Sequence, residues 1–164
     1  MCSQNSHISE CSNSALALAS GEFVVLLDHD DLIPEHCLWM VAFYINSHPE
    51  CKVLFSDEDK IGKYGQRQDP YFKGAFDEYL LYGHNMVTHL GVYRRSLVEA
   101  SGGFRRGFEG AQDYDLIPAL LRQMRSKANC AYSSCPLPLT HDARVHGDLR
   151  RPEELCNPGC ENGD

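Results

Sequence analysis

An apolar stretch that ends in a group of carboxylates constrains the fold of this chain more than any other feature. Residues Phe23–Leu27 are all apolar, Gly21 lies shortly before them, and Asp28, Asp30 and Asp31 follow them. A short apolar run bounded by glycine and charge is typical of a buried parallel strand, and open α/β sheets bind ligands beyond the carboxyl ends of such strands. The sequence therefore predicts an α/β fold with these acids at a ligand site.

The spacing of these acids points to a bound metal ion. Three carboxylates within four residues repel one another and lose hydration when they are brought together. A divalent cation between them is the simplest compensation, because hard ions prefer carboxylate oxygens. The alternative is a loop whose acids cap a helix that begins near Pro34. We expect the metal site.

Helical and extended patterns alternate along the chain. Ser12 or Asn13 is the expected cap of the first helix, and Gly21 is placed to end it. The patterns predict helices over residues 9–19, 34–48, 96–100 and from 113 onward, and strands over 22–28, 52–56 and 86–94.

The first two predicted strands enclose a helix and therefore form a βαβ unit. Such a unit implies parallel strands joined by a right-handed crossover. The second strand also ends in acids, Asp57, Glu58 and Asp59, so two strand tips carry carboxylates. Residues 60–85 are rich in glycine and aromatic side chains and are expected to form a long loop over the site.

Length and charge narrow the class of protein. The 164 residues, 43% of them hydrophobic and 23% charged, suit one globular domain over residues 1–147 followed by a polar tail over 148–164. A net charge of −8 argues against a nucleic-acid partner, because nucleic-acid binders carry a basic surface. The apolar runs are too short to span a bilayer.

Cysteine content bears on the cellular compartment. The chain has eight cysteines, yet its first residues contain no apolar signal segment. The spacings between the cysteines match no usual zinc-binding pattern. A reduced, cytoplasmic protein is the expected interpretation.

Five sequence motifs occur together in one order. They are Ser12–Phe23, Leu27–Asp31, Ser56–Lys60, Tyr93–Leu97 and the stretch from Gly102 to Leu116. Their succession over roughly residues 7 to 125 resembles the GT-A catalytic domain of glycosyltransferase family 2. The resemblance implies a Rossmann-like α/β fold for nucleotide-diphospho-sugar transfer, with a mainly parallel sheet flanked by helices.

The resemblance also implies roles for the first acids. Asp28 and Asp30 match an Asp-x-Asp motif that binds a nucleotide-sugar donor through Mg²⁺ or Mn²⁺, with Asp30 touching the metal and Asp31 beside the donor. The family often has a metal-binding histidine late in the domain, and here His141 is preferred to His146. A loop histidine without a ligand role is the alternative.

Further acids match motifs on the acceptor side. Asp113 corresponds to the family's general base, with Gln112 in place of the more frequent Glu. It would take a proton from the acceptor hydroxyl during inverting displacement; the alternative is an ordinary acid in the first turn of a helix. The run Asp57–Asp59 corresponds to a motif beside the sugar and acceptor, and its alternative is a solvated turn.

The resemblance does not extend to the opening segment of the family. Members begin with a strand, a helix and a second strand that help to hold the nucleotide base, whereas Met1 lies just before the helix predicted over 9–19. We therefore expect a partial catalytic domain with reduced nucleotide affinity. The strand at 22–28 is expected to present an open edge on which another chain could pair.

Three alternative functions are compatible with these residues. The first is a metal-dependent, inverting glycosyltransferase that acts on a saccharide or lipid-linked saccharide in cell-surface polysaccharide synthesis, as the resemblance implies. The second is a non-catalytic remnant or interaction module of the same fold. The third is a metal-dependent phosphohydrolase, which Leu32 disfavours because it occupies the place of a Thr or Val in the common phosphatase pattern.

Overall fold

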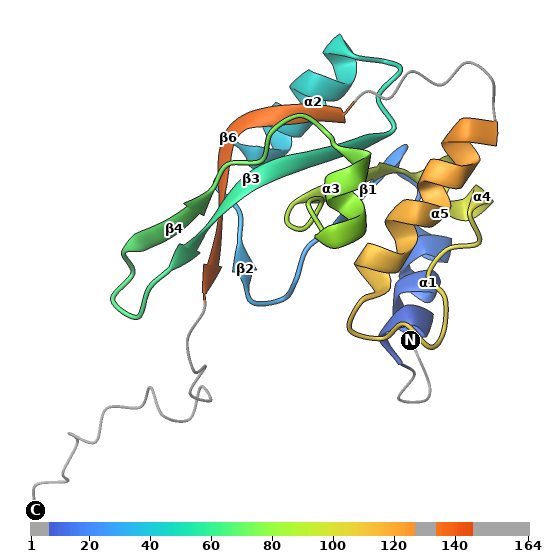
Figure 1. Ribbon diagram of the computed structural model, residues 1–164, viewed down its shortest axis with the longest axis horizontal. Coiled ribbons are helices and arrows are strands. Elements are labelled where there is room, and N and C mark those ends of the chain that lie inside the picture. The colour runs from blue at the N-terminus through green and yellow to red at the C-terminus, as the bar shows by residue number, and fades with distance from the viewer. Residues whose placement is uncertain (1–6, 127–133, 146–164) are drawn as a thin grey trace, which may run out of the picture.

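The chain folds around a mixed sheet that has helices on both faces (Figure 1). A computed structural model describes residues 7–126 and 134–145, and for the last strand it describes the backbone alone. The helices are α1 (Ile8–Leu18), α2 (Cys37–Ser47), α3 (Glu78–Gly83), α4 (Arg95–Ala100) and α5 (Gln112–Ser126). The strands are β1 (Phe23–Leu26), β2 (Asp31–Leu32), β3 (Val53–Ile61), β4 (Arg67–Tyr71), β5 (Gly91–Arg94) and β6 (Ser134–Val145).

Successive side chains of the central strands serve two separate cores. Leu54 on β3 and Val92 on β5 pack with Cys37 and other residues on the α2 side of the sheet. Their neighbours Phe55 and Tyr93 pack against the side chains of α3, α4 and α5. Adjacent strand residues point to opposite faces, so an apolar strand that is covered on both sides supplies both cores. Figure 1 accordingly shows α2 apart from the group formed by α1, α4 and α5.

The strand order differs from the expected parallel arrangement. The order is β1-β5-β3-β6-β2, and β4 pairs with the far end of β3. Of these pairs, β3 and β6 are parallel, whereas β1·β5, β3·β5, β3·β4 and β2·β6 are antiparallel. The prediction of a mainly parallel sheet was therefore wrong. Because β5 is antiparallel to both β1 and β3, those two strands run in the same direction but are not neighbours.

Strand β3 continues through the acids that were expected to follow its tip. It extends to Ile61, so Asp57, Glu58 and Asp59 lie inside the strand. The expected loop over 60–85 contains β4, which pairs with the end of β3, and also α3. The physical reason is that β4 and β6 pair with this part of β3, while Lys73 and Arg67 neutralise Glu58 and Asp59.

The first helix begins earlier than its expected caps. His7 occupies the N-cap position of α1 without a capping bond from its side chain, and Asn13 therefore lies inside the helix rather than at its start. The Asn13 side chain instead bonds the backbone of Phe104, donating to its O at 2.8 Å and accepting from its N at 2.8 Å. The turn before Phe104 contains Gly103 at φ +71°, where a Cβ would lie 2.4 Å from Asn13 Oδ1. This contact fixes α1 against the turn after α4.

The other boundaries follow the expectation more closely. Helix α2 begins at Cys37, whose backbone N–H donates to Pro34 O at 2.9 Å in the preceding turn. Helices α4 and α5 begin within one residue of the predicted positions, and α5 contains Pro118. Strand β5 is shorter than the predicted 86–94. Strand β1 stands at one end of the strand order, and its use as a pairing edge stays a prediction.

The Asn13 contact gives a stability prediction. Asn13→Ala removes both partners of the Phe104 backbone groups and is expected to destabilise the fold by about 1–3 kcal/mol in urea unfolding. Ser14→Ala is the control, because Ser14 Oγ bonds only Glu10 O, 2.8 Å away in the exposed face of the same helix. Equal unfolding midpoints for the two variants would contradict this account of how α1 is attached.

Candidate functional site

An open cleft of about 360 Å³ lies where β1, the segment before β5 and the start of α5 meet. Asp28 and His89 line it together with Tyr93, and Gln112 and Asp113 line it from the start of α5. The end of an apolar strand and the first turn of a helix therefore face one cavity. Two acids for which the sequence predicted roles, Asp28 and Asp113, are thus brought together.

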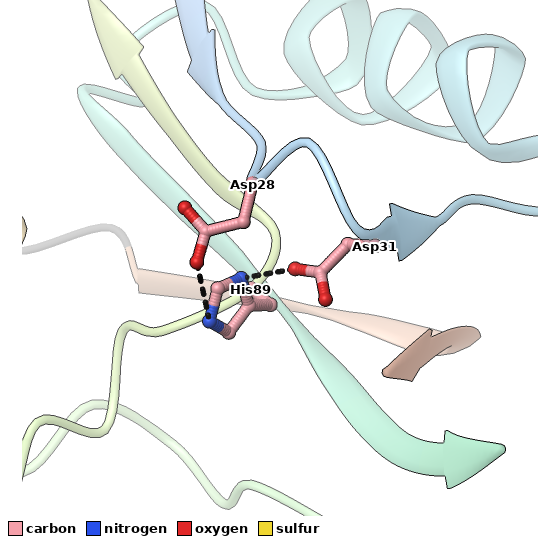
Figure 2. A group of neighbouring side chains, drawn as sticks. All are labelled: Asp28, Asp31 and His89. Carbon is pink, nitrogen blue, oxygen red and sulfur yellow. Dashed lines mark ion pairs between the residues drawn. The ribbon is translucent and has the colours of Figure 1, made fainter. Parts of the chain in front are cut away.

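His89 stands between two of the acids that follow β1 (Figure 2). Its Nδ1 lies 2.6 Å from Asp31 Oδ2, and its Nε2 lies 3.9 Å from Asp28 Oδ2. The side chains of Asp31 and His89 are buried, whereas that of Asp28 is 63% exposed. One ligand atom from each residue lies within 4.8 Å of the others, so the three could hold one metal ion.

The sequence did not single out His89. It lies within residues 86–94, which were interpreted as a strand, and its apolar neighbours gave no sign of a site. A single histidine among the mostly apolar residues of that predicted strand was the available signal. Two carboxylates and an imidazole fit a first-row divalent ion, since Mn²⁺ favours carboxylate oxygen and imidazole suits several metals of that row.

The other predicted metal ligands are placed differently. Asp30 makes an ion-pair contact with the exposed His29, whose Nδ1 is 3.9 Å from Asp30 Oδ1. His141 lies on β6, for which the side chains are outside the description, and His146 is outside the described residues. Metal binding by Asp30 and His141 stays a prediction.

Asp113 occupies the first turn of α5 and is held by a neighbour from another segment. Asn85 Nδ2 donates to Asp113 Oδ2 at 2.8 Å. The positive end of the helix dipole favours a carboxylate at this position. Asp115, two residues on, accepts from Arg105 Nε at 2.8 Å and is committed to that ion pair. The two acids of the same turn thus have different surroundings, and Asp113 is the one that faces the cleft.

Tyr93 forms part of the cleft wall beside these groups. The residue is buried, and burial raises the pKa of its phenol, with the negative charge of Asp113 adding to the effect. The hydroxyl therefore stays protonated at ordinary solution pH. It offers a neutral hydrogen-bond donor close to the acid of α5.

The acids inside β3 accept hydrogen bonds from Lys73 and Arg67, which follow them in the chain. Asp57 Oδ1 accepts from the backbone N–H of Lys73 at 2.6 Å, and Glu58 Oε2 accepts from Lys73 Nζ at 3.0 Å. Asp59 Oδ2 accepts from Arg67 Nε at 2.6 Å, a contact that raises the pKa of Arg67. None of these acids is among the described residues that line the cleft. Their donor-binding role stays a prediction.

Comparisons with known proteins agree with this architecture. An uncharacterized protein, y4gI, of Sinorhizobium fredii (strain NBRC 101917 / NGR234) is 45% identical over 123 residues, covering 75% of this chain and 14% of that protein. The O-antigen biosynthesis protein RfbC of Myxococcus xanthus is 35% identical over 129 residues, covering 79% of this chain and 10% of that protein. The chain thus spans about a tenth to a seventh of these curated relatives. No protein-family model matches it.

A solved structure shows the fold. The crystal structure of S. aureus TarS 1-349, which has the GT-A fold, matches 88% of this chain and 42% of that chain with a TM-score of 0.61 and 22% identity. The fold is GT-A, in part. No helix in the described part of this chain has the length and apolar character needed to cross a membrane.

The buried phenol gives a pH prediction. A raised native pKa means that the folded state keeps its proton above pH 10.0, where an ordinary tyrosine releases it. The contribution of this proton to the free energy of unfolding should be fully present below that pH and should be lost as the pH rises above it. In urea unfolding, Tyr93→Phe should lose stability less steeply than the wild type over this alkaline range. Parallel pH dependences of the two proteins would contradict the proposed environment of Tyr93.

Proposed function

We propose that this chain is part of a glycosyltransferase of family 2 that transfers a sugar from a nucleotide-diphosphate donor to an acceptor hydroxyl, with inversion and with a divalent metal ion. The observation that carries the proposal is the cleft in which Asp28 and His89 face the same space as Asp113. A donor site and a base on opposite elements are the parts that such a displacement needs.

Metal dependence is supported by the donor set at one side of the cleft. Asp28, Asp31 and His89 would hold Mg²⁺ or Mn²⁺, and without a cation their negative charge would repel a diphosphate. When bound, the ion supplies Lewis-acid stabilisation of the charge on the departing nucleoside diphosphate. The adjacent Asp30 remains available to the donor from its exposed position.

Asp113 is the proposed general base. Asn85 occupies Oδ2 of this carboxylate, which orients the group and leaves Oδ1 for the acceptor. The acceptor hydroxyl loses its proton to Asp113 while its oxygen forms a bond to the anomeric carbon. The bond from that carbon to the diphosphate oxygen breaks on the opposite face, so the configuration inverts.

The cellular role is proposed from the curated relative. RfbC of Myxococcus xanthus is named for O-antigen biosynthesis. We infer that this chain likewise acts in cell-surface polysaccharide synthesis in the cytoplasm, with a saccharide or lipid-linked saccharide as acceptor. The same two carboxylates could serve a phosphohydrolase, but that alternative gives no role to Asp113, which lines the same cleft from α5.

The base assignment predicts a separation of binding from turnover. Asp113→Asn should lower the rate of nucleoside-diphosphate release from a panel of UDP- and dTDP-sugars by about 10²–10⁴-fold, because proton transfer of this kind contributes that much. Binding of UDP or dTDP in the presence of Mn²⁺, measured by calorimetry, should be unchanged.

Asp69→Asn is the matched control, since Asp69 is an exposed acid on the β3–β4 hairpin beside Lys60. A full rate in Asp113→Asn would refute its role as base. Release of inorganic phosphate without sugar transfer would favour a phosphohydrolase, and a folded protein that binds no nucleotide would favour a non-catalytic module.

A further inference from the structure

Lys73 is a buried cation between the strand of acids and the segment that carries His89. Its side chain is fully shielded from solvent. Nζ donates to Glu58 Oε2 at 3.0 Å, to His89 O at 2.9 Å and to Thr88 O. Its backbone N–H donates to Asp57 Oδ1 at 2.6 Å. The residue lies between β4 and α3, far in sequence from the acids that follow β1.

These contacts satisfy Lys73 completely. An ammonium group has three protons, and among the described residues Glu58, Thr88 and His89 each offer this one an oxygen acceptor. A charge without such partners would be costly to bury, so the arrangement is stable only while the acceptors keep their positions. Lys73 therefore restrains the positions of the Thr88 and His89 carbonyl groups.

Additional bonds attach the same short segment to β3. Thr88 Oγ1 donates to Glu58 Oε2 at 3.3 Å, and Leu90 N donates to Ser56 Oγ at 2.9 Å. The backbone on both sides of His89 is thus tied to a central strand. From this support the His89 ring reaches across to the acids that follow β1 (Figure 2).

The ring has a defined orientation at the cleft. The buried side chain of Asp31 places Oδ2 2.6 Å from Nδ1, and Nε2 lies 3.9 Å from Asp28 Oδ2. A carboxylate so close to Nδ1 favours the tautomer that carries its proton on that nitrogen. Asp28 and His89 are among the residues that line the cleft. A carboxylate next to one ring nitrogen restrains the orientation of the imidazole, as is common around metal-binding histidines.

We propose that Lys73 is a positioning residue for the donor site. It fastens the Thr88–His89 backbone to Glu58, and so holds the His89 ring between Asp31 and Asp28 with Nε2 presented to the cleft. This inference rests on the proposed function for its metal ion. It also gives Glu58 a role as the anchor of Lys73.

The first test reports on the ring without any metal. In the full chain, the ring ¹⁵N resonances of His89, assigned by their loss in His89→Gln, should show one fixed tautomer with the proton on Nδ1. Lys73→Met should shift these resonances toward an average of the two tautomers. Lys63→Met should leave them unchanged, since Lys63 is an exposed lysine on the β3–β4 hairpin. A folded Lys73→Met with wild-type His89 resonances would overturn the proposal.

A second variant covers loss of folding. Lys73→Met leaves Glu58 without its cation in a largely buried position, which could unfold the chain. The double variant Lys73→Met/Glu58→Gln removes both charges and still lacks the attachment. Its His89 resonances should be averaged as well, and wild-type resonances in this folded variant would overturn the proposal.

The second readout is the dissociation constant for Mn²⁺ alone, measured from the electron paramagnetic resonance signal of the free ion. Lys73→Met should bind Mn²⁺ roughly 10–100-fold more weakly than the wild type, as is usual when the support of a ligand is removed. An unchanged constant would overturn the proposal. If the wild type itself binds no Mn²⁺, the proposed metal dependence is refuted. The ring resonances of His89 still decide the role of Lys73 in that case.

Discussion

Insertion of β5 between β1 and β3 is the constraint on which the rest of the structure depends. Val24 on β1 and Val53 on β3 both pair in register with Tyr93, so one strand of four residues joins β1 to the rest of the sheet. Its side chains also contribute to both cores. Because the segment before β5 carries Asn85 and His89, the same pairing places them beside the acids that follow β1 and those that begin α5.

Charge is distributed unevenly among the acids of the chain. Those inside β3 have cationic partners close by, such as Arg67 for Asp59, and they support the sheet. Asp28 is largely exposed at the cleft, and the His89 imidazole lies 3.9 Å from its carboxylate. An acidic cleft attracts divalent cations and repels anions until a cation is bound. The separation of structural acids from cleft acids is thus a consequence of where the lysine and arginine side chains lie.

Local patterns predicted much of the fold. The apolar run of β1, the helical periodicity of α2 and the acidic first turn of α5 all specify their own conformations, and those elements lie where the sequence placed them. The motifs also led to the GT-A fold, which the likeness to TarS shows. These features are encoded within a few consecutive residues, so they can be read without knowledge of the rest of the chain.

The remaining features depend on contacts between distant segments. Nothing near β1 indicates that its neighbour is β5, about 70 residues later, which is why the sheet was expected to be parallel. The acids of β3 looked like a strand tip because Lys73 and Arg67, which neutralise them, follow later in the chain. His89 was hidden for the same reason: its partners Asp28 and Asp31 belong to another element.

The central claim is that a metal ion and a nucleotide meet in the cleft between Asp28, His89 and Asp113. The most direct test is the paramagnetic broadening of backbone amide resonances when Mn²⁺ is added with UDP. The account predicts that Asp28 and His89 broaden first and Asp113 next, that α2 on the other face stays sharp, and that Asp28→Asn abolishes the effect. Broadening centred on the acids of β3, or spread evenly over the chain, would contradict it.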